Sequence, residues 1–198
     1  MFRLIGFYDY TVILTYVSLI SALLGMGLAS HGHFTAAICC LMVSGLCDAF
    51  DGIVARSKKG RTEDEQNFGI QIDSLCDCIS FGVFPAVLCY HMGVRTAAGV
   101  VILMLYVLCA VIRLAFFNVL EAKRQQQEAG ANKYYRGMPV TTISMLLPPV
   151  YLLYFVMSAP SFTLLLHIVM ALCAFLFVLD FSVKKINWMK VLGLDHKN

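Results

Sequence analysis

Long apolar segments, separated by short polar or charged stretches, dominate this sequence of 198 residues. A helix that crosses a bilayer needs about 20 mostly apolar residues. Because 60% of the residues are hydrophobic and only 14% are charged, an ordinary soluble domain and a disordered chain are both excluded. We predict a single all-α integral membrane domain over residues 1–198. Six transmembrane helices are expected, at residues 11–30, 33–53, 70–90, 97–118, 140–158 and 162–181.

The distribution of Lys and Arg predicts which side of the membrane each connection faces. If all six segments cross, 13 of the 15 Lys and Arg residues lie on the side that holds both termini and the two long loops. Arg95 lies on the other side, and Arg113 lies inside the fourth segment. Cytoplasmic loops carry an excess of Lys and Arg. We therefore expect a cell-membrane protein with both termini in the cytoplasm, and a short amphipathic helix over residues 1–10 along that membrane surface.

Four aspartates interrupt the apolar pattern at the predicted cytoplasmic ends of the second and third segments. Asp48 and Asp51 are three residues apart, and Asp73 and Asp77 are four apart, so each pair shares one helix face. The two segments are consecutive and antiparallel, so these faces can meet at one depth. Four carboxylates at close range need a countercharge. Mg²⁺ or Mn²⁺ would supply it, and two ions suit four carboxylates.

The residues beside the aspartates are small or basic. Small residues let a ligand or a neighbouring backbone approach closely, and an Arg carries a fixed positive charge suited to phosphate. The same residues also have ordinary explanations, because Gly and Ala permit tight helix packing and Arg anchors a cytoplasmic helix end. The residues concerned are Gly52, Ala55, Arg56 and Gly69.

Together these positions resemble the signature of the CDP-alcohol phosphotransferase family. The matching pattern is Asp48-x-x-Asp51-Gly52-x-x-Ala55-Arg56, then twelve residues, then Gly69-x-x-x-Asp73-x-x-x-Asp77. We expect the intervening residues, 57–68, to form a charged cytoplasmic loop. Within the family, the stretch DSLCDCISFGVFPA at 73–86 resembles the phosphatidylserine synthases of the bacterial and archaeal membrane type, as do RLAFFN at 113–118 and RGMP at 136–139. Phe116 departs from that group, which commonly has a second Arg there.

The resemblance implies transfer of the phosphatidyl group from CDP-diacylglycerol to the hydroxyl of L-serine, with release of CMP. It implies that Asp48, Asp51, Asp73 and Asp77 hold the divalent ions and that Asp77 is also the general base. It further implies a homodimer, and no nucleic-acid partner is expected. The expected CDP-lipid site consists of Thr15, Asp48, Gly52, Ala55, Arg56, Gly69 and Asp73.

The acceptor serine needs a cation for its carboxylate. Arg113 lies in an apolar segment and therefore needs a partner or a ligand. We predict that it binds the serine carboxylate or a lipid phosphate, with Asn118 and Arg136 as helpers; pairing of Arg113 with one of the aspartates is the structural alternative.

Three functional alternatives remain open at this point. The same chemistry could use another alcohol, such as glycerol-3-phosphate or inositol. A cation or proton transporter also carries intramembrane acids, but it would distribute them along a path across the bilayer, ideally with inverted repeats. Here the acids gather at one depth, and the sequence has no internal repeat. A purely structural membrane scaffold would leave the four aspartates unexplained.

Overall fold

The structure is a computed structural model, which describes residues 6–7, 10–57, 60, 62–126 and 134–184. Most of them are helical, and the two strands have three residues each. The elements in chain order are η1 (Tyr10–Val12), α1 (Ile13–Ser30), α2 (Phe34–Ser57), α3 (Glu63–Asp77), η2 (Cys78–Val83), α4 (Phe84–His91), α5 (Ala97–Gln126), β1 (Tyr134–Arg136), η3 (Val140–Thr142), α6 (Ile143–Leu152), η4 (Leu153–Phe155), α7 (Ala159–Val178) and β2 (Ser182–Lys184).

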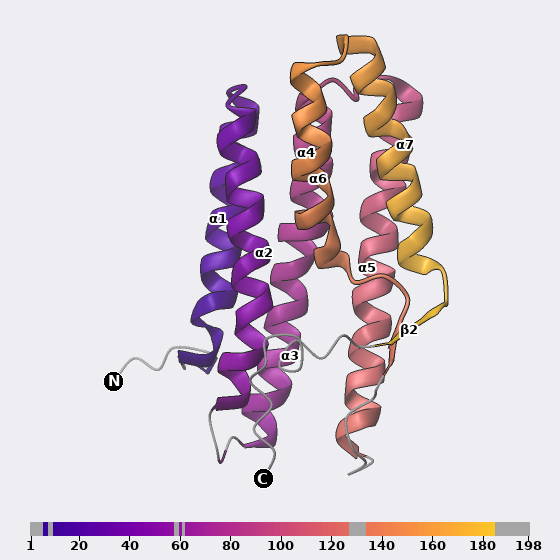
Figure 1. The fold of residues 1–198 in the computed structure, drawn as a ribbon. Coiled ribbons are helices and arrows are strands. Elements are labelled where there is room, and N and C mark those ends of the chain that lie inside the picture. The colour runs from indigo at the N-terminus through magenta and orange to yellow at the C-terminus, as the bar shows by residue number, and fades with distance from the viewer. Residues whose placement is uncertain (1–5, 8–9, 58–59, 61, 127–133, 185–198) are drawn as a thin grey trace.

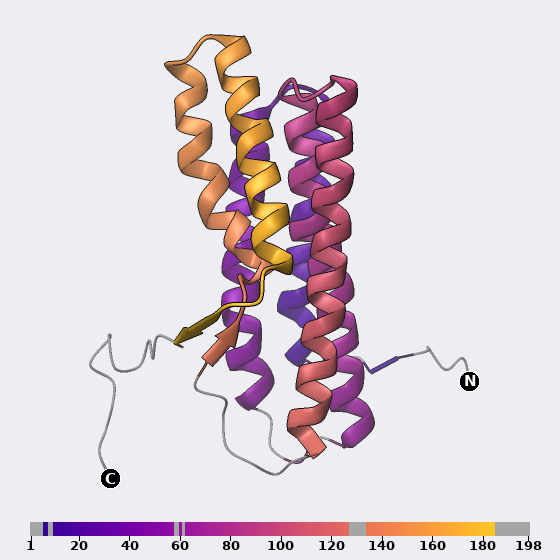
Figure 2. The same ribbon diagram turned by 90° about the vertical axis from the view of Figure 1, so that its right-hand side faces the viewer.

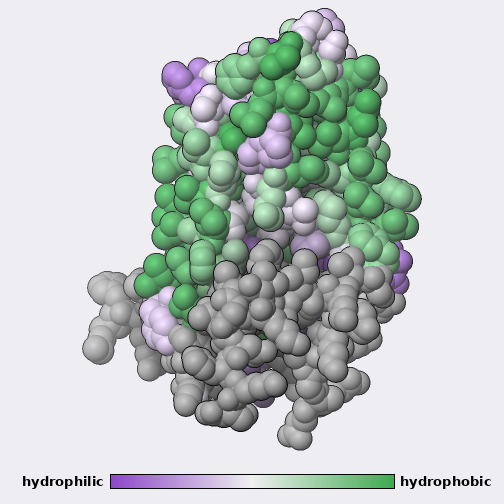
Figure 3. Space-filling view, in the orientation of Figure 1, coloured by the Kyte–Doolittle hydropathy of each residue, from purple (hydrophilic) through white to green (hydrophobic). Residues whose placement is uncertain are grey.

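The helices form an elongated bundle with a common long axis (Figures 1 and 2). The links α1–α2, α4–α5 and α6–α7 lie at one end, the upper end in Figure 1, and the end of α2, the start of α3 and the end of α5 lie at the other. The bundle surface above the lower end is mostly hydrophobic (Figure 3). This arrangement and the apolar helices indicate an all-α, multi-pass membrane protein.

Among the residues that the structure describes, five helical segments are long and apolar enough to cross a membrane. A further apolar segment, Val140–Phe155, is shorter. It consists of η3, α6 and η4, with Pro148 and Pro149 inside α6, where the missing amide hydrogens weaken regular helix geometry. The five long segments are Ile13–Ser30, Phe34–Gly52, Glu63–His91, Ala97–Ala122 and Ala159–Val178.

The loop predicted at 57–68 is shorter than expected, because α3 begins at Glu63 rather than at residue 70. Thr62 and Glu65 form a capping box. The Glu65 amide donates to Thr62 Oγ1 at 3.2 Å, and the Thr62 amide donates to Glu65 Oε2 at 2.9 Å. Three acidic residues in the first turn suit the positive end of the helix dipole. A charged sequence therefore forms an exposed extension of the third span.

The two short strands were not predicted. β1 pairs with β2 in an antiparallel ladder, with Tyr134 opposite Lys184 and Arg136 opposite Ser182. The ladder lies below α6 and α7 in Figure 2 and ties the segment before α6 to the segment after α7. The predicted amphipathic helix at 1–10 falls mostly outside the described residues, which there include only Gly6, Phe7 and Tyr10.

A π-helix, η2, directly follows the acidic residue Asp77 and joins α3 to α4. Pro85 has no amide hydrogen to donate to the carbonyl of Phe81, four residues earlier. The hydroxyl of Tyr106, from α5, donates to that carbonyl at 2.6 Å instead. Tyr106 and Phe81 are both fully buried. A single interhelical hydrogen bond thus holds the irregular part of the third span against α5.

Small residues line the buried face of α1 and bring it close to its neighbours. Ala22, Gly25 and Ala29 are all buried there. A side chain on Gly25 would run into the ring of Phe84, whereas nothing lies within 4 Å of a Cβ built on Gly27. Close packing of this kind is the main source of helix association within a bilayer.

Gly25→Ala is expected to lower the free energy of unfolding by about 1–3 kcal/mol, because the methyl group overpacks the α1–α4 contact. Gly27→Ala is the matched control on the same helix, and it should be neutral or up to about 1 kcal/mol stabilising. Denaturant unfolding in detergent, followed by circular dichroism, measures both. Equal effects of the two substitutions would show that the α1–α4 contact is not as close as described.

Tyr106→Phe is expected to cost about 1–3 kcal/mol, because it leaves the buried Phe81 carbonyl without its donor while keeping the ring. Tyr90→Phe is the control: its side chain is 41% exposed, and its loss of a hydroxyl should change the free energy of unfolding by less than about 0.5 kcal/mol. The same unfolding assay compares them. A Tyr106→Phe protein as stable as the wild type would show that this hydroxyl does not stabilise η2.

Candidate active site

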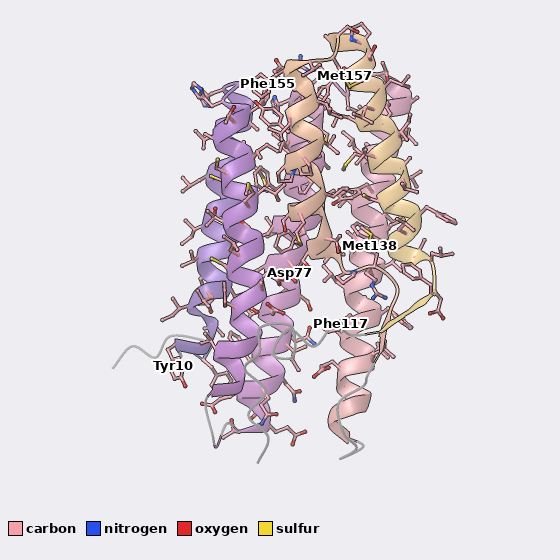
Figure 4. All side chains as sticks on the ribbon, in the orientation of Figure 1. Tyr10, Asp77, Phe117, Met138, Phe155 and Met157 are labelled. Carbon is pink, nitrogen blue, oxygen red and sulfur yellow. The ribbon has the colours of Figure 1, made fainter. Side chains whose placement is uncertain are left out.

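Three of the four predicted aspartates, one on α2 and two on α3, come together in the structure. Asp48, Asp73 and Asp77 each offer a carboxylate oxygen, and these oxygens all lie within 4.8 Å of one another. We call these three residues the acid cluster. Asp77 is only 8% exposed, and it lies at about the height of Met138, where the chain approaches α6 (Figure 4). The helical spacing of the two acid pairs therefore produces the predicted juxtaposition.

Asp51 lies beside this cluster rather than within it. Its carboxylate is in hydrogen-bonding range of Asp73, as that of Asp48 is of Asp77. On its other side, the hydroxyl of Thr15 donates to Asp51 Oδ2 at 3.4 Å. The predicted contact of Thr15 with the CDP-lipid stays a prediction, and its buried hydroxyl lies beside this carboxylate. One side chain of α1 thus orients the acid nearest the end of α2.

The acid cluster fits a hard divalent cation. Asp73 Oδ1 is buried, and it has no hydrogen-bond partner among the described residues. A buried acceptor without a donor is costly unless something satisfies it. Every ligand atom in the cluster is a carboxylate oxygen, the type that Mg²⁺ and Mn²⁺ prefer. Both the orphaned oxygen and the donor set are therefore what a bound cation requires.

The other residues predicted for the CDP-lipid flank the acid cluster on the same two helices. Gly52 follows Asp51 in α2, and Gly69 lies one turn before Asp73 in α3. The backbone of α2 extends through Ala55 and Arg56, whose side chains lie outside the described part of the structure.

Arg113, predicted to bind the acceptor, contacts two other segments of this chain. Its Nε donates to the carbonyl of Met138 at 3.1 Å, and the side chain is 9% exposed. Gly137 passes over the guanidinium with φ +72°, and a Cβ there would be 3.1 Å from Arg113 Nη1 and 3.0 Å from the Leu179 carbonyl oxygen. The amide of Gly137 also donates to the carbonyl of Phe181 at 2.6 Å.

Arg113 therefore lies where the segment before α6 crosses the segment after α7. The negative charge of Asp180, next to Leu179, also acts on it. Sequence reasoning left pairing of Arg113 with an aspartate open, but it did not anticipate the contact with Met138 and Gly137. Arg136 belongs to β1, and its side chain lies outside the described residues.

Asn118, the third residue predicted for the acceptor, bonds to a residue that sequence reasoning gave no role. The hydroxyl of Ser74 donates to Asn118 Oδ1 at 2.7 Å and joins α3 to α5. Ser74 is next to Asp73 in the sequence, inside the DSLCD motif. Its place in that motif was the only available signal, because the partner is 44 residues away.

The comparisons with known proteins identify the family. The family model for CDP-alcohol phosphatidyltransferase matches residues 10–179. The chain is 34% identical over 158 residues to the CDP-diacylglycerol–serine O-phosphatidyltransferase of Saccharomyces cerevisiae, which covers 76% of this chain and 55% of that protein. It is 37% identical over 133 residues to the archaetidylserine synthase of Methanothermobacter thermautotrophicus, which covers 67% of this chain and 53% of that protein.

A CDP-diacylglycerol–serine O-phosphatidyltransferase of Mycobacterium tuberculosis is 33% identical over 127 residues, with 64% of this chain and 43% of that protein covered. The chain thus spans about half the length of the curated relatives it matches. No solved structure is significantly similar to it. The family match contains α2, α3 and the acid cluster, and the resemblance noted in the sequence is confirmed: this chain belongs to the CDP-alcohol phosphatidyltransferase family.

Proposed function

We propose that this protein transfers the phosphatidyl group of CDP-diacylglycerol to the hydroxyl of L-serine, giving phosphatidylserine and CMP. The observation that carries the proposal is the acid cluster, formed by side chains of α2 and α3 within the region matched by the family model. The relatives from Saccharomyces cerevisiae and Mycobacterium tuberculosis are named for this serine reaction, which favours serine over other alcohols.

In the proposed reaction, the serine oxygen attacks the phosphorus that carries the diacylglycerol group. The bond from that phosphorus to the oxygen of CMP breaks, and CMP leaves with this oxygen. Asp77 accepts the proton of the serine hydroxyl, and its burial shields the transfer from bulk water. Asp51, held by Thr15, supports the arrangement from the α1 side.

We propose that Asp48, Asp73 and Asp77, with Asp51 beside them, hold divalent metal, Mg²⁺ or Mn²⁺, in two ions. When bound, the metal neutralises the pyrophosphate charge and favours departure of CMP. Gly52, Ala55, Arg56 and Gly69 are proposed to receive the nucleotide end of the lipid. Arg113, Asn118 and Arg136 are the proposed residues for the serine.

We also propose that Val140–Phe155 is the sixth membrane span. Its 16 residues are few for a crossing, but η3, α6 and η4 run along the bundle axis beside the longer helices (Figure 1). With six crossings, the excess of Lys and Arg places both termini, and the end of the bundle near the acid cluster, at the cytoplasmic face of the cell membrane. The homodimer implied by the family resemblance is part of this proposal.

The clustering of the acids disfavours the transporter. A transport path needs ionisable groups at several depths, whereas Asp48, Asp73 and Asp77 converge on one point. The choice of lipid donor is less constrained, because the Methanothermobacter relative is named an archaetidylserine synthase. Donors with acyl and with ether chains therefore both belong in the assay.

Asp77→Asn is expected to reduce serine-dependent CMP release by at least about 100-fold, because an amide cannot accept the proton of the serine hydroxyl. The assay uses the purified protein in detergent with CDP-diacylglycerol and Mn²⁺, and it offers L-serine, glycerol-3-phosphate and inositol separately. Asp64→Asn, an exposed acid on the same helix, is the control and should retain wild-type activity.

Release of CMP with glycerol-3-phosphate or inositol, but not with serine, would contradict serine as the acceptor. It would still support transfer of the phosphatidyl group to an alcohol. A folded wild-type protein that releases no CMP with any acceptor would contradict the proposed function. Full activity of Asp77→Asn with serine would remove Asp77 as the base.

Mn²⁺ is expected to stabilise the wild-type protein against thermal unfolding, because a ligand that binds only the folded state shifts the equilibrium. At about 100 times its Kd the stabilisation is roughly 2.7 kcal/mol. Asp73→Asn should lose most of this shift, because it replaces the carboxylate that holds the orphaned oxygen. Asp64→Asn should show the full wild-type shift.

This measurement requires no turnover, so it tests the metal site separately from the reaction. An equal Mn²⁺ shift in the wild-type and Asp73→Asn proteins would place the bound metal elsewhere.

A further inference from the structure

The hydrogen bond between Ser74 and Asn118 lies one residue away from the acid cluster. Ser74 is 9% exposed on α3, directly after Asp73, and its hydroxyl is 2.7 Å from Asn118 Oδ1 on α5. A short hydrogen bond between two side chains on different membrane helices holds both side chains in one conformation. This pair is not needed to explain the metal or the base.

The bond determines which edge of the Asn118 amide is available. Ser74 donates, so the amide oxygen is committed to α3, and the Nδ2 group faces away from Ser74. Among the residues that the structure describes, Nδ2 has no hydrogen-bond partner. Asn118 therefore presents two neutral N–H donors beside α3, the helix that carries Asp73 and Asp77.

We propose that these Nδ2 donors bind the carboxylate of the acceptor serine and that Ser74 is the positioning residue that holds them in place. This inference rests on the proposed function and deepens it. The carboxylate of serine needs a hydrogen-bond donor when it leaves water, and that donor must hold it where the serine hydroxyl can still reach Asp77. Asn118 supplies that donor without adding a charge close to the metal ligands.

The contacts of Arg113 support the assignment of the serine carboxylate to Asn118. Its Nε is used by the Met138 carbonyl, and its guanidinium packs against Gly137. On α5, Arg113 and Asn118 are five residues apart and point to different neighbours: Arg113 contacts the segment before α6, and Asn118 contacts α3. Of these two side chains, Asn118 is thus the one that contacts the helix carrying Asp73 and Asp77.

The inference predicts discrimination between serine and ethanolamine, which is serine without its carboxylate. Asn118→Asp keeps the shape and an oxygen for Ser74, but it loses both donors and adds a negative charge. The KM for serine should rise roughly 10- to 100-fold, while the KM for CDP-diacylglycerol stays within about twofold. CMP release with ethanolamine should not fall, so the preference for serine over ethanolamine should shrink.

Two substitutions at Ser74 test the positioning role. Ser74→Ala frees the amide to turn and should raise the KM for serine about fivefold, with little change in kcat. Ser74→Thr retains a hydroxyl donor and should bring the KM for serine back to within about twofold of the wild type. Asn67→Asp, which adds the same charge at an exposed position of α3, is the matched control and should change neither KM.

An increase in the KM for CDP-diacylglycerol instead of serine would assign the Asn118 amide to a lipid phosphate and overturn the inference. An unchanged KM for serine in Ser74→Ala, or an equal loss of serine and ethanolamine activity in Asn118→Asp, would also overturn it. If Asn118→Asp does not fold, the KM values for serine of Ser74→Ala and Ser74→Thr are sufficient to test the inference. If the wild-type protein releases no CMP with serine, the proposed function itself is refuted. This result is obtained before any variant is compared, so the two failures can be told apart.

Discussion

Carboxylates buried between apolar helices are the constraint on which the rest of this structure depends. An ionised group in a bilayer costs several kcal/mol unless it is paired, hydrated or bound to a cation. The three carboxylates of the acid cluster converge on one point, and Asp73 Oδ1 has no hydrogen-bond donor within the described part of the chain. A divalent cation bound there, as proposed, would supply the countercharge that these carboxylates need. The neighbouring helices supply side chains that hold it: Thr15 from α1 for Asp51, and Asn118 from α5 for Ser74.

The third span shows how an irregular helix can serve such a site. Asp77 ends α3, and the π-helix η2 begins with the next residue. A π-turn rotates the helix that follows it relative to the helix before it, and such turns are frequent at functional sites. Here the irregularity is held by the hydroxyl of Tyr106, which replaces the amide hydrogen that Pro85 lacks. The two aspartates that α3 contributes to the acid cluster thus lie in a regular helix, and the irregular segment η2 begins only after them.

Sequence reasoning succeeded where helical periodicity alone determines the geometry. Spacings of three and four residues predicted that all four aspartates meet at one depth. The structure brings oxygens of Asp48, Asp73 and Asp77 within 4.8 Å of one another and places Asp51 beside them. Reasoning failed where a local signal was overlooked, because the Thr62–Glu65 capping box makes the start of α3 predictable in principle. It could not have found the partner of Arg113 or of Ser74, since these contacts join segments 25 and 44 residues apart and follow from how the helices pack.

The nucleotide and the acceptor are proposed to bind on two different sides of α3. Two adjacent residues of this helix account for both sides. Asp73 faces α2, where the nucleotide is proposed to bind, and Ser74, the next residue, bonds to α5, where the acceptor is proposed to bind. Successive residues on a helix are about 100° apart, so adjacent positions can serve different neighbours. Displacement at phosphorus places the attacking and leaving oxygens roughly in line, on opposite sides of the reacting atom. A helix that carries the acids and has one partner helix for each substrate meets this requirement. In the proposed arrangement, the neighbouring residues Asp73 and Ser74 would therefore separate binding of the lipid nucleotide from recognition of the alcohol.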